Sequence, residues 1–232
     1  MAHPCAYIAD MPTQPLPADP TLDEIGLALA PAIGRNAAFD GWSMAAVTAA
    51  AQEIGVDADV ARLAYKGGAM AMIDCWIDSV DLEVAHRLPP KTLNAMKIRQ
   101  RITALLATRL DIMAPDREAL RRAMGVMAMP QNLARAAKIG WRTADRNWRL
   151  AGDTATDFNH YTKRMTLSAV YGSLLVVFVN DDSEDFADSR GFLDRRIDNV
   201  MQFEKAKAQA KSRSEYIPSL SRFIGRLRYP PS

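Results

Sequence analysis

Cysteine is scarce in this 232-residue sequence, which contains only Cys5 and Cys75. Cys5 lies in a proline-rich terminal stretch and Cys75 in an apolar helical pattern, so we expect no disulfide framework and a reducing, cytoplasmic environment. The first twenty residues hold five prolines but no Lys or Arg. This composition excludes a secretory signal and an Arg-rich transit peptide, and we expect residues 1–20 to form a disordered leader.

Long hydrophobic runs are also missing. The apolar run at residues 169–179 is too short to cross a bilayer, which needs roughly 20 apolar residues. Hydrophobic residues make up 49% of the chain and charged residues 24%, a balance typical of soluble globular proteins. The length fits one domain with terminal appendages.

Strand-like alternation is not convincing anywhere, whereas helical periodicity recurs, so the sequence predicts an all-α fold. Thr21 opens a short first helix, and the stretch at residues 34–41 is interpreted as a connection. A second helix ends at Gly55, and Asp57 caps a third. Two helices joined by a short glycine turn predict a helix-turn-helix-like unit at residues 21–66.

Longer amphipathic helices are expected over residues 67–211, separated by prolines that cannot continue a helix interior. Their expected ranges are 68–88, 92–113, 116–129, 132–150, 157–179 and 183–211.

The helix expected at residues 157–179 changes character along its length. Asp157, His160 and Arg164 recur on one face of its first turns, and that face appears polar and exposed from the sequence. From Leu174 onward the helix is apolar all round, which predicts burial on every side. Core packing explains this pattern, but the small residues around Gly172 also leave room for a slim apolar ligand.

The C-terminal residues 212–232 predict a basic amphipathic membrane helix. Seven basic residues stand against one acid between Lys205 and Arg228, a balance of +6, whereas the whole chain sums to +2. Docking of this helix on its own domain is the alternative. The residues expected to bind a membrane are Leu220, Phe223, Ile224 and Leu227 on the apolar face, with Arg222 and Arg226 opposite.

Several segments together resemble the Coq-nine family of ubiquinone-biosynthesis lipid-binding accessory proteins. They are AGDTATDFNHYTKR, AVYGSLL, NDDSEDF and FLDRRIDN, with weaker similarity in MAMPQN and GWSMAAVTAAAQEIGV. The resemblance covers most of residues 39–201. It implies a tetracycline-repressor-like helical bundle that binds isoprenoid lipid instead of DNA, is not an enzyme, and works with the di-iron demethoxyubiquinone hydroxylase.

The resemblance also implies a site. Asp157, His160, Tyr161 and Arg164 match the surface that docks the hydroxylase, although the family usually carries Trp where this chain has His160. An imidazole buries less area than an indole, so that contact is expected to be weaker or differently built. Residues expected to hold the lipid are Met127, Met129, Leu167, Val170, Tyr171, Leu174, Leu175 and Phe178. By analogy with the fold, a homodimer through the last long helices is expected, resting peripherally on the cytoplasmic membrane face.

Parts of the sequence fit two other functions. A DNA-binding repressor would use residues 43–66, but three acids and two basic residues there sum to −1, where operator binding needs several phosphate contacts. A di-iron site would use the pairs Glu83–His86 and Asp157–His160, but the further inward-facing Glu residues are missing. We therefore expect no metal and no cofactor.

Overall fold

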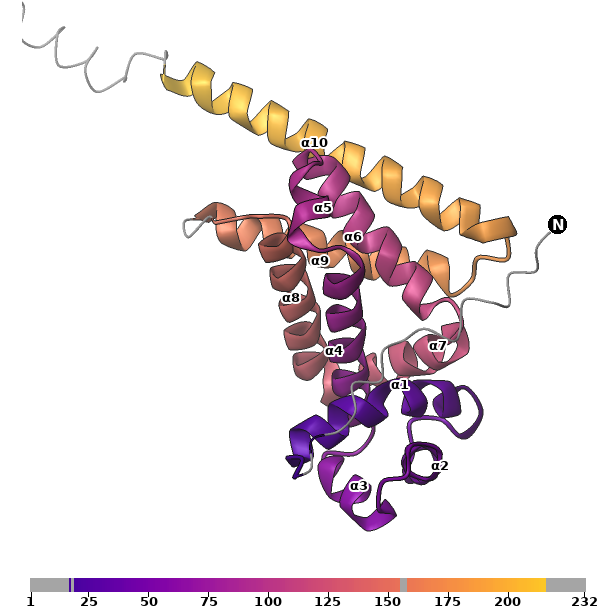
Figure 1. The fold of residues 1–232 in the computed structure, drawn as a ribbon. Coiled ribbons are helices and arrows are strands. Elements are labelled where there is room, and N and C mark those ends of the chain that lie inside the picture. The colour runs from indigo at the N-terminus through magenta and orange to yellow at the C-terminus, as the bar shows by residue number, and fades with distance from the viewer. Residues whose placement is uncertain (1–16, 18, 155–157, 216–232) are drawn as a thin grey trace, which may run out of the picture.

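The computed structural model describes residues 17, 19–154 and 158–215, and the side chains of these residues up to Gln202 except that of residue 158. All regular structure within these residues is helical, which confirms the predicted all-α fold (Figure 1). The elements are α1 (Leu22–Asp40), α2 (Met44–Ile54), α3 (Ala58–Ala64), α4 (Ala69–Arg87), α5 (Pro90–Asn94), α6 (Ile98–Met113), α7 (Arg117–Met127), η2 (Pro130–Asn132), α8 (Leu133–Leu150), α9 (Phe158–Phe178), η3 (Glu184–Phe186) and α10 (Ala187–Glu215).

Helices α1, α2 and α3 form the predicted helix-turn-helix-like unit at one end of the molecule (Figure 1). Thr21 and Glu24 make a reciprocal capping box at the start of α1. Gly55 ends α2 in the left-handed conformation, with φ of 80°, and the Asp57 side chain caps α3 by accepting from two backbone amides.

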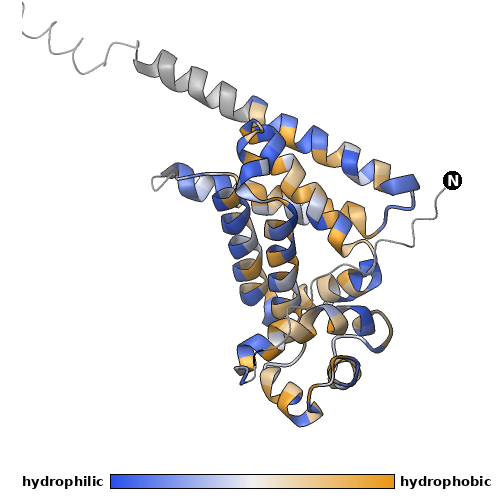
Figure 2. Ribbon diagram, in the orientation of Figure 1, coloured by the Kyte–Doolittle hydropathy of each residue, from blue (hydrophilic) through white to orange (hydrophobic). Residues whose placement is uncertain are grey.

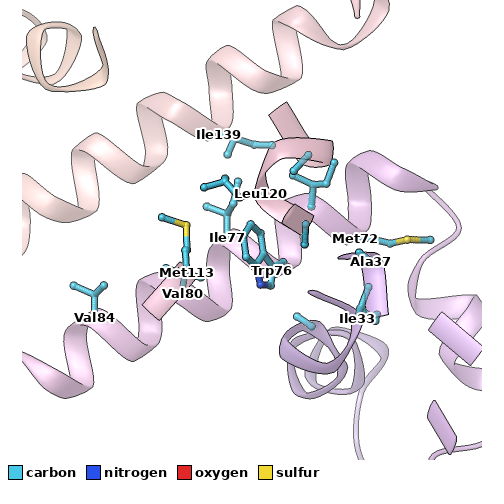
Figure 3. Packing of buried hydrophobic residues seen from close by; sticks show 14 of the residues in the cluster. Ile33, Ala37, Met72, Trp76, Ile77, Val80, Val84, Met113, Leu120 and Ile139 are labelled. Atoms are coloured by element: carbon cyan, nitrogen blue, oxygen red, sulfur yellow. The ribbon is translucent and has the colours of Figure 1, made fainter. Parts of the chain in front are cut away.

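The expected connection at residues 34–41 is wrong, because α1 continues to Asp40. A β-carbon at position 34 would come within 2.5 Å of the Trp76 indole nitrogen, so glycine there permits close packing of α1 on α4. Figure 3 shows Trp76 within this packing, near Ile33 and Ala37 of α1. Glycine at position 34 thus permits a contact with Trp76, which lies 42 residues later in the chain.

The expected helix at residues 92–113 is divided into α5 and α6. Arg101 stabilises the break: its guanidinium donates to the carbonyl oxygens of Met96 and Ala151 at 2.9 and 2.8 Å. Backbone carbonyls left free at a helix end need such partners. The break therefore depends on a loop fifty residues away.

Asp181 fixes the junction between α9 and α10. Its buried carboxylate accepts four hydrogen bonds, from the backbone and hydroxyl groups of Ser183 and Ser189. Burial alone would raise the pKa of this carboxyl, but these hydrogen bonds lower it to about 2. Helix α10 then crosses α9 and α6, burying Leu193 and Ile197, while most of its coloured residues are hydrophilic (Figure 2).

One hydrophobic core runs through the described residues, from Leu29 of α1 to Phe178 of α9. It is continuous across position 66, where we placed the boundary of the helix-turn-helix-like unit. No described helix is both long and apolar enough to span a membrane. The expected membrane residues, 220–227, lie outside the described residues.

Candidate protein and lipid interface

Helix α9 has two apolar faces with opposite surroundings. One carries Arg164, Leu167, Tyr171, Leu174 and Phe178 at steps of three and four residues, and all five are buried. The other carries an exposed stripe, made of Tyr161, Met165, Ala169, Gly172 and Val176. The prediction of burial on every side after Leu174 is therefore wrong, because the Val176 side chain is 54% exposed.

An aromatic group stands at the N-terminal end of this stripe. The ring centroid of Trp141, on α8, lies 6.0 Å from that of Tyr161 and 6.4 Å from that of His160. Tyr161 is 59% exposed and Met165, one turn further, is 63% exposed. An indole from α8 thus lies beside position 160.

Arg164 does not lie on this surface, so its expected role as an exposed docking residue is wrong. Its side chain is 2% exposed and donates from Nε to Asp145 Oδ1 at 2.6 Å and from Nη1 to Asp153 Oδ2 at 3.1 Å. It also donates to the carbonyl oxygen of His160 at 3.1 Å. Arg164 therefore joins α8, the following loop and α9. Its hydrogen bond to the His160 carbonyl holds the backbone that carries the aromatic group.

The two carboxylates are held ionised by this arrangement. Burial would raise the pKa of Asp145, but the hydrogen bonds and charges of Arg164 and Arg149 outweigh it and lower that pKa. Burial would also raise the pKa of Asp153, but the hydrogen bonds and charges of Lys163 and Arg164 outweigh burial and lower that pKa.

Of the four expected docking residues, the structure brings His160 and Tyr161 to the surface group, and Asp157 lies outside the described residues.

Five of the eight residues expected to hold lipid are buried in the core. Leu167, Val170, Tyr171, Leu174 and Phe178 are each at most 8% exposed, and Leu175 and Met127 are partly buried. Met129 is 44% exposed. Two cavities of the described chain lie elsewhere: one of about 40 Å³ beside Trp76 and Asp116, and an open groove of about 520 Å³ beside Cys75.

A polar cluster that the sequence pattern did not predict lies under α9. Arg109 of α6 is 1% exposed, donates from Nε to the Tyr171 hydroxyl at 3.0 Å, and pairs with Asp81 of α4. Burial would lower the pKa of Arg109, but Tyr171 and Asp81 raise it, so the guanidinium remains charged. Tyr171 is therefore bound to a buried ion pair rather than surrounded only by apolar groups.

The residues of the two alternative functions have local partners. The buried Glu83 carboxylate binds Arg87 at 2.6 Å and lies 3.9 Å from His86, so its partners are side chains of its own helix. In the part of the chain that the structure describes, no three His, Cys, Asp or Glu side chains gather as a metal site would need. Arg62, on α3, is held by Asp59 at 2.7 Å and by Thr48 at 3.2 Å.

Comparisons with known proteins agree with this architecture. The family model of COQ9 matches residues 133–204, which include α8 and α9. The chain is 29% identical over 182 residues to "Ubiquinone biosynthesis protein COQ9, mitochondrial" of Rattus norvegicus, covering 75% of this chain and 58% of the rat protein. The protein of the same name from Homo sapiens is 28% identical, with 75% and 57% covered. The chain thus spans less than two thirds of these relatives' length.

Among solved structures, a TetR transcriptional regulator from Nitrosomonas europaea shares the fold. Its TM-score is 0.59 at 18% identity, with 78% of this chain and 98% of the regulator covered. At this identity the likeness concerns the fold, and the sequence comparisons concern the family. Together they show that the chain has a tetracycline-repressor-like all-α fold and that its sequence is similar to the COQ9 proteins.

Proposed function

We propose that this chain acts in ubiquinone biosynthesis as a non-catalytic lipid-binding protein, which holds an isoprenoid quinone intermediate and presents it to a di-iron demethoxyubiquinone hydroxylase. The observation that carries the proposal is the exposed apolar stripe of α9, which lies inside the segment matched by the COQ9 model. Exposed stripes of this kind mark surfaces that bind lipid or protein.

The hydroxylase would dock on the aromatic end of the stripe. Trp141 and Tyr161 combine large apolar area with few rotatable bonds, and Trp and Tyr dominate the energetics of many protein interfaces. Met165 adds a flexible apolar side chain beside them. Buried Arg164 fixes the backbone beneath them, so little order has to be gained on binding. In this proposal the indole of Trp141 takes the part of the missing aromatic ring at position 160.

The prenyl chain would lie along the second half of the stripe, over Ala169, Gly172 and Val176. A β-carbon at Gly172 would meet nothing within 4 Å, so there is open space above this turn. Leu174 and Phe178 form the packed layer beneath, and partly buried Leu175 can adapt to the chain. At about 0.8 kcal/mol per buried methylene-sized group, two isoprene units would supply roughly 8 kcal/mol before the costs of ordering.

The lipid part is tested by Gly172→Asp, which places a charge in the middle of the stripe. We expect prenylquinones extracted from the purified protein, measured by mass spectrometry, to fall at least tenfold. Gly125→Asp is the matched control, since Gly125 is also an exposed helical glycine with open space around it. Equal lipid content in both variants would contradict the proposal. So would a Gly172→Asp protein that loses only its dimer and keeps its lipid.

The docking part is tested by Trp141→Ala and Tyr161→Ala. Loss of a central aromatic anchor costs about 2 kcal/mol, so each variant should bind the hydroxylase roughly 30-fold more weakly at unchanged lipid content. Leu133→Ala is the control, because Leu133 is 54% exposed on the same helix as Trp141 but away from the aromatic group. Unchanged affinity in both aromatic variants, measured by titration calorimetry, would refute the docking surface.

Membrane association would depend on residues 212–232, of which 216–232 lie outside the described residues. We expect Phe223→Asp to abolish flotation with anionic vesicles while the wild type floats in low salt only. Flotation that is unaffected by the substitution would mean that another surface contacts the membrane.

A further inference from the structure

An open groove of about 520 Å³ lies where α1, α3, α4 and α8 meet, on the side of α4 that is not used by α6 or α7. Ala71, Cys75, Asp78 and Leu82 line it at steps of four, three and four residues, so one face of α4 forms its base. The eleven steps from Ala71 to Leu82 extend roughly 16 Å along the helix. The groove is within the size range of sites that bind small molecules or peptide segments.

The apolar margins of the groove are uncovered. Leu22 of α1 is 44% exposed and Leu82 of α4 is 55% exposed, and both line the groove. The charged side chains that line it form two ion pairs, Arg135 with Asp74 at 3.4 Å and Arg146 with Asp78, and include one further acid, Asp23. A fitting occupant is therefore apolar and carries little charge of its own.

We propose that residues 5–16 of this same chain occupy the groove and cover its α4 face. Leu22 is both the first residue of α1 and part of the groove lining, so the preceding chain leaves α1 at the margin of the groove. Twelve extended residues reach roughly 37 Å, more than twice the length of the α4 face. The segment has no Lys or Arg, one acid, and the apolar residues Tyr7, Ile8, Met11 and Leu16.

Tethering favours this occupant over a free one. A segment joined to the groove by about six residues has an effective concentration in the millimolar range, so even a millimolar affinity leaves the groove occupied about half the time. The prolines at positions 12 and 15 also reduce the freedom that the free segment would lose on binding. The inference concerns a different surface from the α9 stripe and does not rest on the proposed function.

Cys75 provides a natural probe, because it lines the groove and is only partly exposed. In the full chain we expect Ile8→Asp to raise the rate of Cys75 alkylation by iodoacetamide about two- to tenfold, since an occupied groove shields the thiol. Gln14→Asp is the matched control: it adds the same charge to the same segment and should leave the rate unchanged.

A second measurement uses the two cysteines directly. Oxidation of dilute wild-type protein with copper–phenanthroline should join Cys5 to Cys75 within one chain, and Ile8→Asp should reduce the yield. Trypsin digestion of the oxidised protein should then release two peptides, residues 1–35 and 67–87, joined by the disulfide. Arg35 is the first Lys or Arg of the chain, and cleavage after Lys66 and Arg87 gives the second peptide.

Three results would overturn the inference. Equal alkylation rates in wild type and Ile8→Asp, without the linked peptide, would show that the segment is not in the groove. A link whose yield rises with protein concentration would assign the groove to a second copy. Protection of Cys75 that disappears on delipidation in wild type and variant alike would assign it to a lipid.

Discussion

Replacing Arg164 with Ala should destabilise the fold far more than replacing its exposed neighbour Arg149. Both guanidinium groups bind Asp145, but the Arg164 side chain is 2% exposed and that of Arg149 is 70% exposed. Arg164→Ala would also leave Asp153 with Lys163 as its remaining partner. The pair of variants therefore compares a buried and an exposed ion pair on one shared carboxylate.

The expected magnitudes differ several-fold. Removing one partner of a buried ion pair costs about 3–5 kcal/mol, whereas an exposed pair contributes about 0–1 kcal/mol. For a chain of this size, 1 kcal/mol shifts Tm by about 2–4 °C. We expect Arg164→Ala to lower Tm by roughly 6–20 °C and Arg149→Ala by less than about 4 °C, measured by circular dichroism at pH 7.

The difference should also depend on pH in a defined direction. The pKa values of Asp145 and Asp153 are lowered in the fold, so their contribution to stability is complete above the unfolded value of 3.8 and is lost as the pH falls through the folded values. The gap between wild type and Arg164→Ala should therefore narrow below about pH 4. Equal Tm values for the two variants at pH 7 would refute the role assigned to Arg164.

Two further substitutions test the packing between α1, α4 and α7. Burial raises the pKa of Asp116 to about 6, against the lowering effect of Arg35, so wild-type stability should fall as the pH rises from about 4 to above 6. Asp116→Asn should gain on the order of 1–2 kcal/mol at pH 8 and nothing at pH 4 in urea titrations, and an equal gain at both pH values would disprove this cause. Gly34→Ala should cost about 1–3 kcal/mol through overlap with Trp76, whereas Gly125→Ala, in open space, should be neutral or stabilising; a stabilised Gly34→Ala would mean that the indole moves easily.

Local signals predicted much of this fold from sequence. Gly55 and Asp57 end and begin helices through interactions with their own neighbours, so the turn between α2 and α3 could be placed. The role of Gly34 within α1 could not be predicted, because the need for a glycine there comes from the Trp76 indole on another helix. The break before α6 escaped prediction in the same way, since Arg101 binds the distant Ala151 carbonyl.

In the candidate site, too, features that depend on neighbours in the sequence could be predicted, and features that depend on another helix could not. The exposed and aromatic character of Tyr161 follows from its position in the sequence, but the contribution of Trp141 requires α8 to lie beside α9. The burial of Arg164 had a signal: it begins a stripe that continues through Leu167 and Tyr171 to fully buried residues. That its charge is balanced by Asp145 on another helix could be learned only from the structure.

The Arg109–Asp81 pair beneath Tyr171 limits how deeply an apolar ligand could bind between the helices. Hydrocarbon that displaced Tyr171 would strip the guanidinium of a hydrogen-bonding partner, and no alkyl chain can replace it. The buried ion pair thus forms a polar layer that an apolar ligand does not penetrate. In the function proposed above, a prenyl tail would therefore lie lengthwise on the surface of α9, with its quinone end close to the docked protein.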